Sequence, residues 1–205
     1  MSKMDEMILV AKRNALFGER DELVFQGVTT DKELATKIIN YLSQNIEVMR
    51  RGDAEENLTY KQPIPYVVIK KGEQVYAYKR LSGGGESRLH SKLSIGFGGH
   101  MNQTDDVSFV DILMTNLQRE LDEELEIKYH TYRLKPVGLI NDDNNEVGKV
   151  HIGLLYTFEI DDEATIEVKE KDQIEGFWLD IKDLKNDEIY NNLESWSQFV
   201  ADVLN

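Results

Sequence analysis

A regular apolar repeat runs through the middle of this sequence and predicts the structure expected there. An apolar side chain recurs every four residues, at Phe109, Leu113, Leu117, Leu121 and Leu125. Side chains four residues apart lie on one side of an α-helix, so these five form a single apolar stripe. Such a stripe is stable only against another layer of the protein. The sequence therefore predicts a helix over residues 105–126 with one face in the core.

Segments with strand patterns lie on both sides of this helix. Before it, residues 66–70 and 74–80 are rich in Val, Ile and Tyr and flank a Lys-Gly-Glu turn, which predicts a β-hairpin. After it, four further strands are expected at 134–140, 149–160, 165–170 and 174–180, with turns at 141–148 and 161–164. A second helix is expected from about residue 189. This order of strands and helices predicts an α/β domain with helices packed on a sheet.

The first 60 residues form a separate pattern. The apolar runs 7–11 and 22–28 predict a hairpin, and Thr30 with Glu33 predicts a capping box for a helix that continues to about Met49. A polar stretch then ends in Pro63 and Pro65, which favours a boundary near Tyr60. We therefore expect an α+β extension over residues 1–60, made of a hairpin and a helix, and a main domain over residues 61–205.

Composition excludes several classes of function. The chain has no cysteine, so disulfides, thiolate metal sites and cysteine nucleophiles are excluded, which fits a reducing, cytoplasmic location. No stretch approaches the roughly 18 apolar residues of a membrane helix, and no signal peptide is expected at the start. The net charge of -14 argues against binding to duplex nucleic acid. A small anionic substrate would then need a local metal ion.

Carboxylates border the apolar stripe of the central helix. At about 100° per residue, Glu124 lies about 20° from Leu117, Glu120 about 60° and Glu123 about 120°. Partly buried carboxylates of like charge repel each other, and a hard divalent cation such as Mg²⁺ relieves this repulsion. A solvated acidic face is the alternative, since the chain has 38 Asp and Glu residues.

The same helix carries a resemblance to a known family. Residues 119–127, RELDEELEI, resemble the end of the Nudix signature, which reads Arg-Glu-apolar-x-Glu-Glu-x-Gly-apolar. The matching positions are Arg119, Glu120, Leu121, Glu123, Glu124 and Ile127. The resemblance covers roughly residues 61–205 and implies an α/β/α sandwich with a mixed sheet. It also implies Mg²⁺ or Mn²⁺ as cofactor, Glu120, Glu123 and Glu124 as ligands, and Arg119 as the residue that orients a carboxylate.

Three positions depart from that signature. Gly99 in the Gly-Phe-Gly-Gly-His segment resembles the first glycine, but the distance to Arg119 is six residues longer than the signature allows. Asp111 stands where the signature has its first glutamate. Glu126 replaces a glycine that would end the helix in a left-handed turn. We expect a larger loop and a different helix end.

Further side chains are candidates for substrate contact and proton transfer. Arg80, Arg88 and His90 flank the three glycines 83–85, and a guanidinium suits phosphate oxygens, so Arg80 and Arg88 are expected to bind substrate together with Gly99. The general base is either a helix glutamate or Glu146 in the 141–148 turn. His90 and His100 could equally be structural.

These observations predict a metal-dependent hydrolase of a phosphoanhydride bond in a nucleoside diphosphate derivative. The alternative is a non-catalytic Nudix-like sensor that binds an ADP-ribose-like nucleotide, although all three glutamates are present. An isoprenoid diphosphate isomerase would use a cysteine, which the chain lacks. The extension could cap the site, form a homodimer surface or bind another protein.

Overall fold

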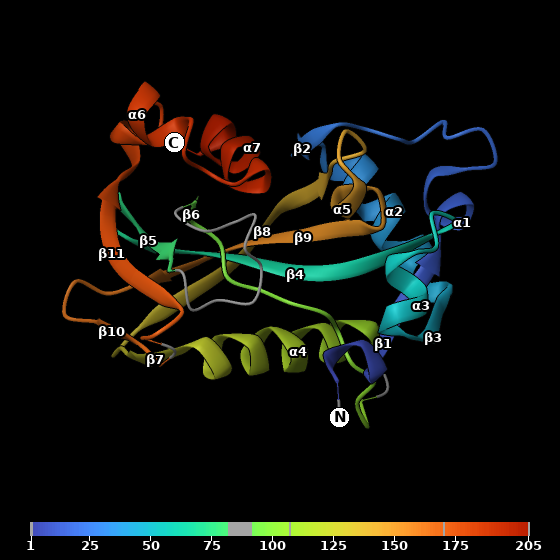
Figure 1. The fold of residues 1–205 in the computed structure, drawn as a ribbon, viewed down its shortest axis with the longest axis horizontal. Coiled ribbons are helices and arrows are strands. Elements are labelled where there is room, and N and C mark those ends of the chain that lie inside the picture. The colour runs from blue at the N-terminus through green and yellow to red at the C-terminus, as the bar shows by residue number, and fades with distance from the viewer. Residues whose placement is uncertain (1, 82–91, 107, 170, 205) are drawn as a thin grey trace. The chain divides into compact units, whose positions relative to one another are not determined.

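The computed structural model describes residues 2–81, 92–106, 108–169 and 171–204 (Figure 1). The chain divides into two compact units. The first comprises Met1–Pro65, Gly99–Gln118 and Val137–Leu155, and the second comprises Tyr66–Gly98, Arg119–Pro136 and Tyr156–Asn205. Four elements contribute residues to both units, namely strands β4 (Tyr60–Lys71), β8 (Tyr132–Asn141) and β9 (His151–Ile160) and helix α4 (Phe109–Glu124).

The remaining elements belong to one unit each. Those of the first unit are η1 (Lys3–Asp5), β1 (Met7–Lys12), α1 (Arg13–Phe17), β2 (Gly27–Thr29), α2 (Lys32–Gln44), β3 (Ile46–Arg50), α3 (Arg51–Glu55) and α5 (Glu146–Lys149). Those of the second are β5 (Gln74–Arg80), β6 (Leu93–Ser94), β7 (Leu125–Lys128), β10 (Thr165–Val168), β11 (Ile174–Asp180), η3 (Ile181–Asp183), α6 (Asp187–Tyr190) and α7 (Ser195–Val203).

Hydrogen bonding among the described residues links nine strands into one sheet. Its main path is β11-β5-β4-β9-β8-β2, with β1, β3 and β6 attached beside that path. A separate two-stranded sheet joins β10 to β7. The α/β class with a large mixed sheet is confirmed.

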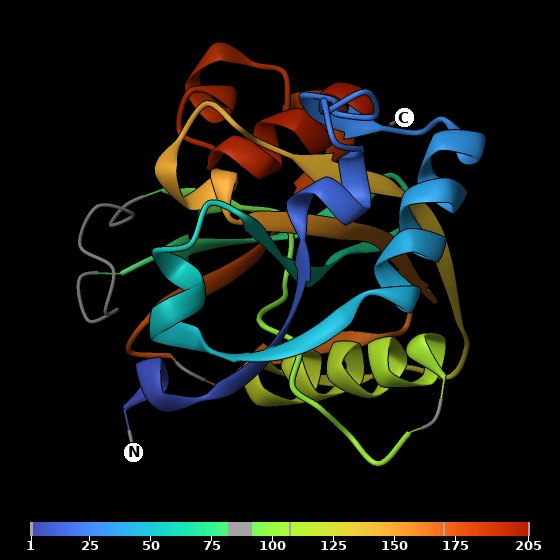
Figure 2. The ribbon, with the colours of Figure 1, turned by 90° about the vertical axis from the view of Figure 1, so that its right-hand side faces the viewer.

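The N-terminal strands do not form the predicted hairpin. β1 pairs antiparallel with β3, with Ile8 opposite Met49, and with the start of β4. β2 pairs with β8 instead, with Val28 opposite Ile140. Helix α1 follows directly after β1, so the chain leaves β1 without a tight turn. Figure 2 shows β1, β3 and α3 side by side in the first unit.

Helix α2 is shorter than the sequence predicts. Asp31, rather than Thr30, caps it, because its Oδ1 accepts hydrogen bonds from the backbone N–H groups of Glu33 and Leu34. The helix ends at Gln44, although helical spacing continues to Met49. Residues 46–50 pair with β1 instead, so strand pairing outweighs the local helical pattern there.

Strand β4 runs through the two prolines that predicted a break. Pro63 and Pro65 lack an N–H group, and the neighbouring residues supply the hydrogen bonds. The Gln62 N–H donates to the Val150 carbonyl at 2.7 Å, and the Val67 N–H donates to the Phe97 carbonyl at 2.8 Å. The chain therefore stays extended from Tyr60 to Lys71. The division into residues 1–60 and 61–205 remains a prediction.

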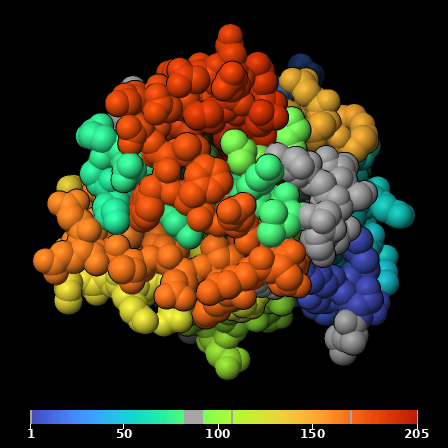
Figure 3. All heavy atoms as spheres, turned by 60° about the vertical axis from the view of Figure 1, so that its left-hand side comes forward, coloured from blue at the N-terminus to red at the C-terminus, as the bar shows by residue number. Residues whose placement is uncertain are grey.

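The second unit contains the predicted hairpin of β4 and β5. Lys71 lies opposite Gln74, and the turn uses Gly72 with a φ of 56°, a conformation that favours glycine. β5 pairs along its length with β11, and the rings of Tyr76 and Trp178 lie 5.1 Å apart. Figure 3 shows β10 and β11 on one face of this unit beside the C-terminal helices α6 and α7.

Helix α4 confirms the central prediction, although it is shorter at both ends. It begins after Ser108, which caps it, because Ser108 Oγ accepts the Asp111 N–H and donates to the Asp111 carboxylate. It ends at Glu124, and Glu126 lies in β7 opposite Glu167, which removes the need for a glycine turn. Within the described ranges, no helix is long and apolar enough to cross a membrane.

Candidate functional site

The last turns of α4 present the predicted glutamates at the edge of a buried stripe. Leu121 and Leu125 are buried on this segment. The Glu120 side chain is 13% exposed and that of Glu123 is 59% exposed, while Glu124 is partly buried. Glu120 and Glu124, which are closer in angle to Leu117, are therefore more buried than Glu123. Two carboxylates therefore lie where they have lost part of their hydration.

Arg119 holds two of these carboxylates. Its Nη2 lies 2.7 Å from Glu120 Oε1, and its Nη1 donates to Glu123 Oε1 at 2.9 Å. Burial alone would lower the pKa of the Arg119 guanidinium, but the hydrogen bond to Glu123 and the charge of Glu120 raise it overall. The guanidinium is thus positioned to fix the direction of both carboxylates, as the resemblance implies.

Arg80, in the same unit, contacts Glu194 and Tyr78 and interacts electrostatically with Glu124. Arg80 Nε donates to Glu194 Oε1 at 2.6 Å, and Nη2 donates to the Tyr78 hydroxyl at 3.2 Å. Burial would lower the pKa of Arg80, but the nearby carboxylates of Glu194 and Glu124 raise it. Burial raises the pKa of Tyr78, with the charge of Glu194 adding to it, so Tyr78 keeps its proton. The sequence pattern did not predict Tyr78 or Glu194 as partners of Arg80.

The other predicted residues are distributed as follows. Arg88 and His90 fall outside the described residues. Gly99 is partly buried in the first unit. Glu146 also lies in the first unit, in the first turn of α5, where its 82% exposed side chain is 2.6 Å from Lys149 Nζ. The roles proposed for these residues remain predictions.

The 141–148 segment is more than the solvent-exposed turn that its composition predicts. Asp142 is 2% exposed, and Asp143 accepts hydrogen bonds from Arg13 at 2.9 and 3.0 Å and from Lys61 at 3.0 Å. Arg13 and Lys61 come from distant parts of the sequence. No local pattern could therefore have predicted this network.

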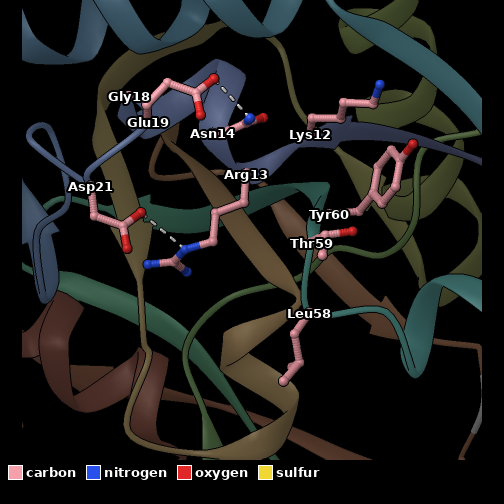
Figure 4. Close-up of a pocket in the computed structure, with 9 residues that line it drawn as sticks. All are labelled: Lys12, Arg13, Asn14, Gly18, Glu19, Asp21, Leu58, Thr59 and Tyr60. Carbon is pink, nitrogen blue, oxygen red and sulfur yellow. Dashed lines mark hydrogen bonds and ion pairs between the residues drawn. The ribbon is translucent and has the colours of Figure 1, made fainter.

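A hollow of about 400 Å³ lies near that network in the first unit (Figure 4). Its lining residues are Lys12, Arg13, Asn14, Gly18, Glu19, Asp21, Leu58, Thr59 and Tyr60. Within it, Arg13 Nε donates to Asp21 at 3.2 Å and Asn14 Nδ2 donates to Glu19 at 3.0 Å. None of the predicted site residues is among these lining residues. The charged groups are paired with neighbouring residues, so the hollow does not compete with α4 as the candidate site.

The donors on α4 fit the metal that the family implies. Glu120, Glu123 and Glu124 offer carboxylate oxygens, which are the ligands that Mg²⁺ and Mn²⁺ prefer. Partial burial of Glu120 and Glu124 raises the cost of leaving their like charges uncompensated. Arg119 offsets only part of that charge, so a divalent cation is chemically suited to this position.

Comparisons with known proteins indicate the family of the chain. No family model matches the chain. Protein YmaB of Bacillus subtilis (strain 168) is 53% identical over 206 residues and is covered, like this chain, over 100% of its length. Among solved structures, Tm1382, provisionally assigned as a Nudix hydrolase, is 32% identical with a TM-score of 0.77, and the match covers 97% of each chain.

A more distant structure shows the fold alone. The MutT Nudix hydrolase of Burkholderia pseudomallei is 16% identical with a TM-score of 0.51, and the match covers 71% of this chain and 98% of that protein. The similarity to Tm1382 is the stronger finding because it extends over nearly all of both chains. Together with the Arg-Glu-Leu-x-Glu-Glu motif on α4, it shows that this chain belongs to the Nudix hydrolase superfamily.

Proposed function

We propose that this chain is a divalent-metal-dependent hydrolase that cleaves a phosphoanhydride bond. Glu120, Glu123 and Glu124 would hold Mg²⁺ or Mn²⁺. When bound, such an ion polarises phosphoryl oxygens and lowers the pKa of a coordinated water. The observation that carries the proposal is the arrangement at the end of α4, where Arg119 joins Glu120 and Glu123 beside a buried leucine stripe.

The side chains of the protein would orient the carboxylates, bind phosphate oxygens and accept a proton. Arg119 keeps two carboxylates oriented, and Arg80 offers guanidinium N–H groups to phosphate oxygens near Glu124. In the reaction, a water oxygen attacks phosphorus, the bond to the bridging oxygen breaks, and the leaving phosphate keeps that oxygen. The attacking water loses its proton to a glutamate of α4 or to Glu146.

The substrate class we propose is a small nucleoside diphosphate derivative. Family membership and the net charge of -14 support it, because a small metal-bound anion can approach where an extended polyanion is repelled.

The absence of cysteine supports a cytoplasmic location. A second copy of the chain, bound through the N-terminal residues, remains a predicted partner.

The decisive experiment is a turnover assay with nucleotide sugars, dinucleotides and nucleoside triphosphates in Mg²⁺ or Mn²⁺. We expect wild type to hydrolyse at least one class, and Glu124→Gln to lose at least about 100-fold in kcat/KM because a metal ligand is removed. Glu126→Gln is the matched control, since Glu126 is exposed and paired with Lys128 in β7. It should retain wild-type activity.

Two outcomes would contradict the proposal. Equal turnover by wild type and Glu124→Gln would exclude Glu124 as a ligand. Tight binding of an ADP-ribose-like nucleotide without any turnover would favour the sensor.

The same assays test Arg80→Lys, which should raise KM because the fork-shaped donor is lost. A Glu146→Gln variant that loses the acidic limb of the pH–rate profile, where the rate falls as the base is protonated, would identify Glu146 as the base.

A further inference from the structure

Three potential metal ligands converge in the first unit, away in sequence from the glutamates of α4. They are Glu55 at the end of α3, His100 in the segment before α4, and His151 at the start of β9. Each offers one ligand atom, and these atoms all lie within 4.8 Å of one another. The three residues share no position with the Nudix motif, so the cluster needs its own explanation.

The orientation of His151 is that of a metal ligand. Its Nδ1 lies 2.6 Å from the Val147 carbonyl oxygen, which can only accept a hydrogen bond, so Nδ1 carries the ring proton. The lone pair of a neutral ring is then on Nε2, which faces His100 and Glu55. A backbone carbonyl that fixes the far ring nitrogen in this way is the usual partner of a metal-binding histidine.

Acceptor atoms crowd around His100 Nε2. It lies 2.7 Å from Gln62 Oε1, 3.2 Å from His151 Nε2 and 3.4 Å from Glu55 Oε1. A ring nitrogen carries at most one proton, so without a metal His100 Nε2 can donate to only one of these acceptors. Two imidazole nitrogens bound to one tetrahedral Zn²⁺ at about 2.0–2.1 Å would be roughly 3.3 Å apart, close to the separation seen here.

The surroundings keep these groups in the form that binds metal. The side chains of His151, His100 and Glu55 are only 8%, 12% and 23% exposed. The Val147 carbonyl holds His151 in the tautomer whose Nε2 lone pair faces the other two ligands. Arg51, whose Nε lies 3.5 Å from Glu55 Oε1, favours the charged carboxylate of Glu55.

We propose that Glu55, His100 and His151 form a second metal site, which takes Zn²⁺ or a similar imidazole-binding divalent ion such as Co²⁺. Two imidazoles and one carboxylate favour such ions over Mg²⁺, which prefers all-oxygen ligands. The amide oxygen of Gln62 lies beside the site and can accept a hydrogen bond from a metal-bound water. A bound ion would cross-link α3, the segment of His100 and β9, and so stabilise the first unit. This inference does not depend on the proposed hydrolase activity.

Titration of the metal-free, untagged full chain with Co²⁺ and Zn²⁺ tests the site. We expect d–d absorption from one Co²⁺ per chain with imidazole ligands, displacement of that ion by Zn²⁺, and a higher melting temperature with Zn²⁺. His151→Gln and Glu55→Gln should each weaken binding by at least about 100-fold, since each removes a ligand. His130→Gln, which alters a 78% exposed histidine outside the cluster, should bind as wild type does.

A measurement on the wild type keeps the test independent of how the variants fold. In ¹⁵N-histidine spectra, Zn²⁺ should shift the ring resonances of two of the four histidines, His100 and His151. Absence of Co²⁺ absorption, unchanged affinity in a folded His151→Gln variant, or a shift in another pair of histidines would overturn the site. Loss of activity in Glu124→Gln concerns only the hydrolase proposal.

Discussion

At the scale of single residues, Lys61 shows the cost and the compensation of a buried charge. Its side chain is fully buried, and its ammonium group donates to Asp143 and to the Gly148 carbonyl, each at 3.0 Å. Burial lowers the pKa of Lys61 to about 8 despite the nearby carboxylate. For Asp143, burial acts to raise the pKa, but Arg13 and Lys61 lower it strongly. The network is therefore stable only as a whole.

Replacing Asp143 with Asn should destabilise the protein by about 2–3 kcal/mol, because two cations lose their carboxylate while Lys61 stays buried. Urea unfolding at pH 7 measures this loss. Because the folded pKa of Asp143 is depressed, its stabilisation is present above the unfolded pKa and is lost as pH falls below about 4. The difference between wild type and Asp143→Asn should shrink over that range.

The control is Asp162→Asn, an exposed aspartate between β9 and β10. It should unfold at the same urea concentration as wild type. A wild-type midpoint for Asp143→Asn would mean that the buried lysine needs no carboxylate, and the electrostatic account of this network would be wrong.

At the scale of elements, a buried asparagine ties helix α4 to the segment that precedes it. Asn116 is 1% exposed. Its Oδ1 accepts the Asn102 N–H at 2.8 Å, and its Nδ2 donates to the Asn102 carbonyl at 2.9 Å. The side-chain amide thus makes both hydrogen bonds that a neighbouring strand would make with the backbone of Asn102. Since His100 is two residues away, the same contact helps to set the position of the proposed second metal site.

Removing this amide in Asn116→Ala should cost about 2 kcal/mol, because both hydrogen bonds to the backbone of Asn102 are lost inside the protein. Thermal and urea unfolding give the change in stability. We also expect weaker Co²⁺ binding, since the segment carrying His100 is less well fixed. Val110→Ala, at a 59% exposed position of the same helix, should change neither quantity. Unchanged stability in Asn116→Ala would exclude this anchoring role.

At the scale of the whole molecule, net charge affects the approach of any anionic substrate. The chain has 38 acidic and 24 basic residues, giving a charge of -14. Like charges repel over roughly one Debye length, which is about 10 Å at 0.1 M salt. In the proposed hydrolase, a nucleotide would therefore approach against the field of the protein, and the proposed cation would act only at short range.

Raising NaCl from about 20 to 150 mM should therefore increase kcat/KM for an anionic nucleotide by roughly two-fold, because screening weakens the repulsion. The measurement uses the substrate found in the turnover assays at fixed free Mg²⁺ concentration. Potassium acetate should give the same dependence, which separates screening from a specific effect of chloride. A fall in kcat/KM with salt would indicate local attraction by basic residues such as Arg80 instead.

Local patterns in the sequence were sufficient for much of the fold and for the proposed metal ligands. The four-residue repeat predicted α4, and segments rich in Val, Ile and Tyr around a Lys-Gly-Glu turn predicted the β4–β5 hairpin. The spacing of Glu120, Glu123 and Glu124 gave their positions around the helix. These features depend on helix and strand periodicity over a few residues, which the sequence displays directly. Their assignment as ligands remains a prediction.

Only the tertiary structure decided the contacts between distant segments. The sequence by itself determined that residues 46–49 could continue a helix, but pairing with β1 made them a strand. It determined that Asp143 is acidic, but the approach of Arg13 and Lys61 made it the centre of a buried network. Glu55, His100 and His151 likewise meet through long-range packing. Periodicity reports which face of an element is apolar, whereas the identity of its partner depends on the energy of the whole packed chain.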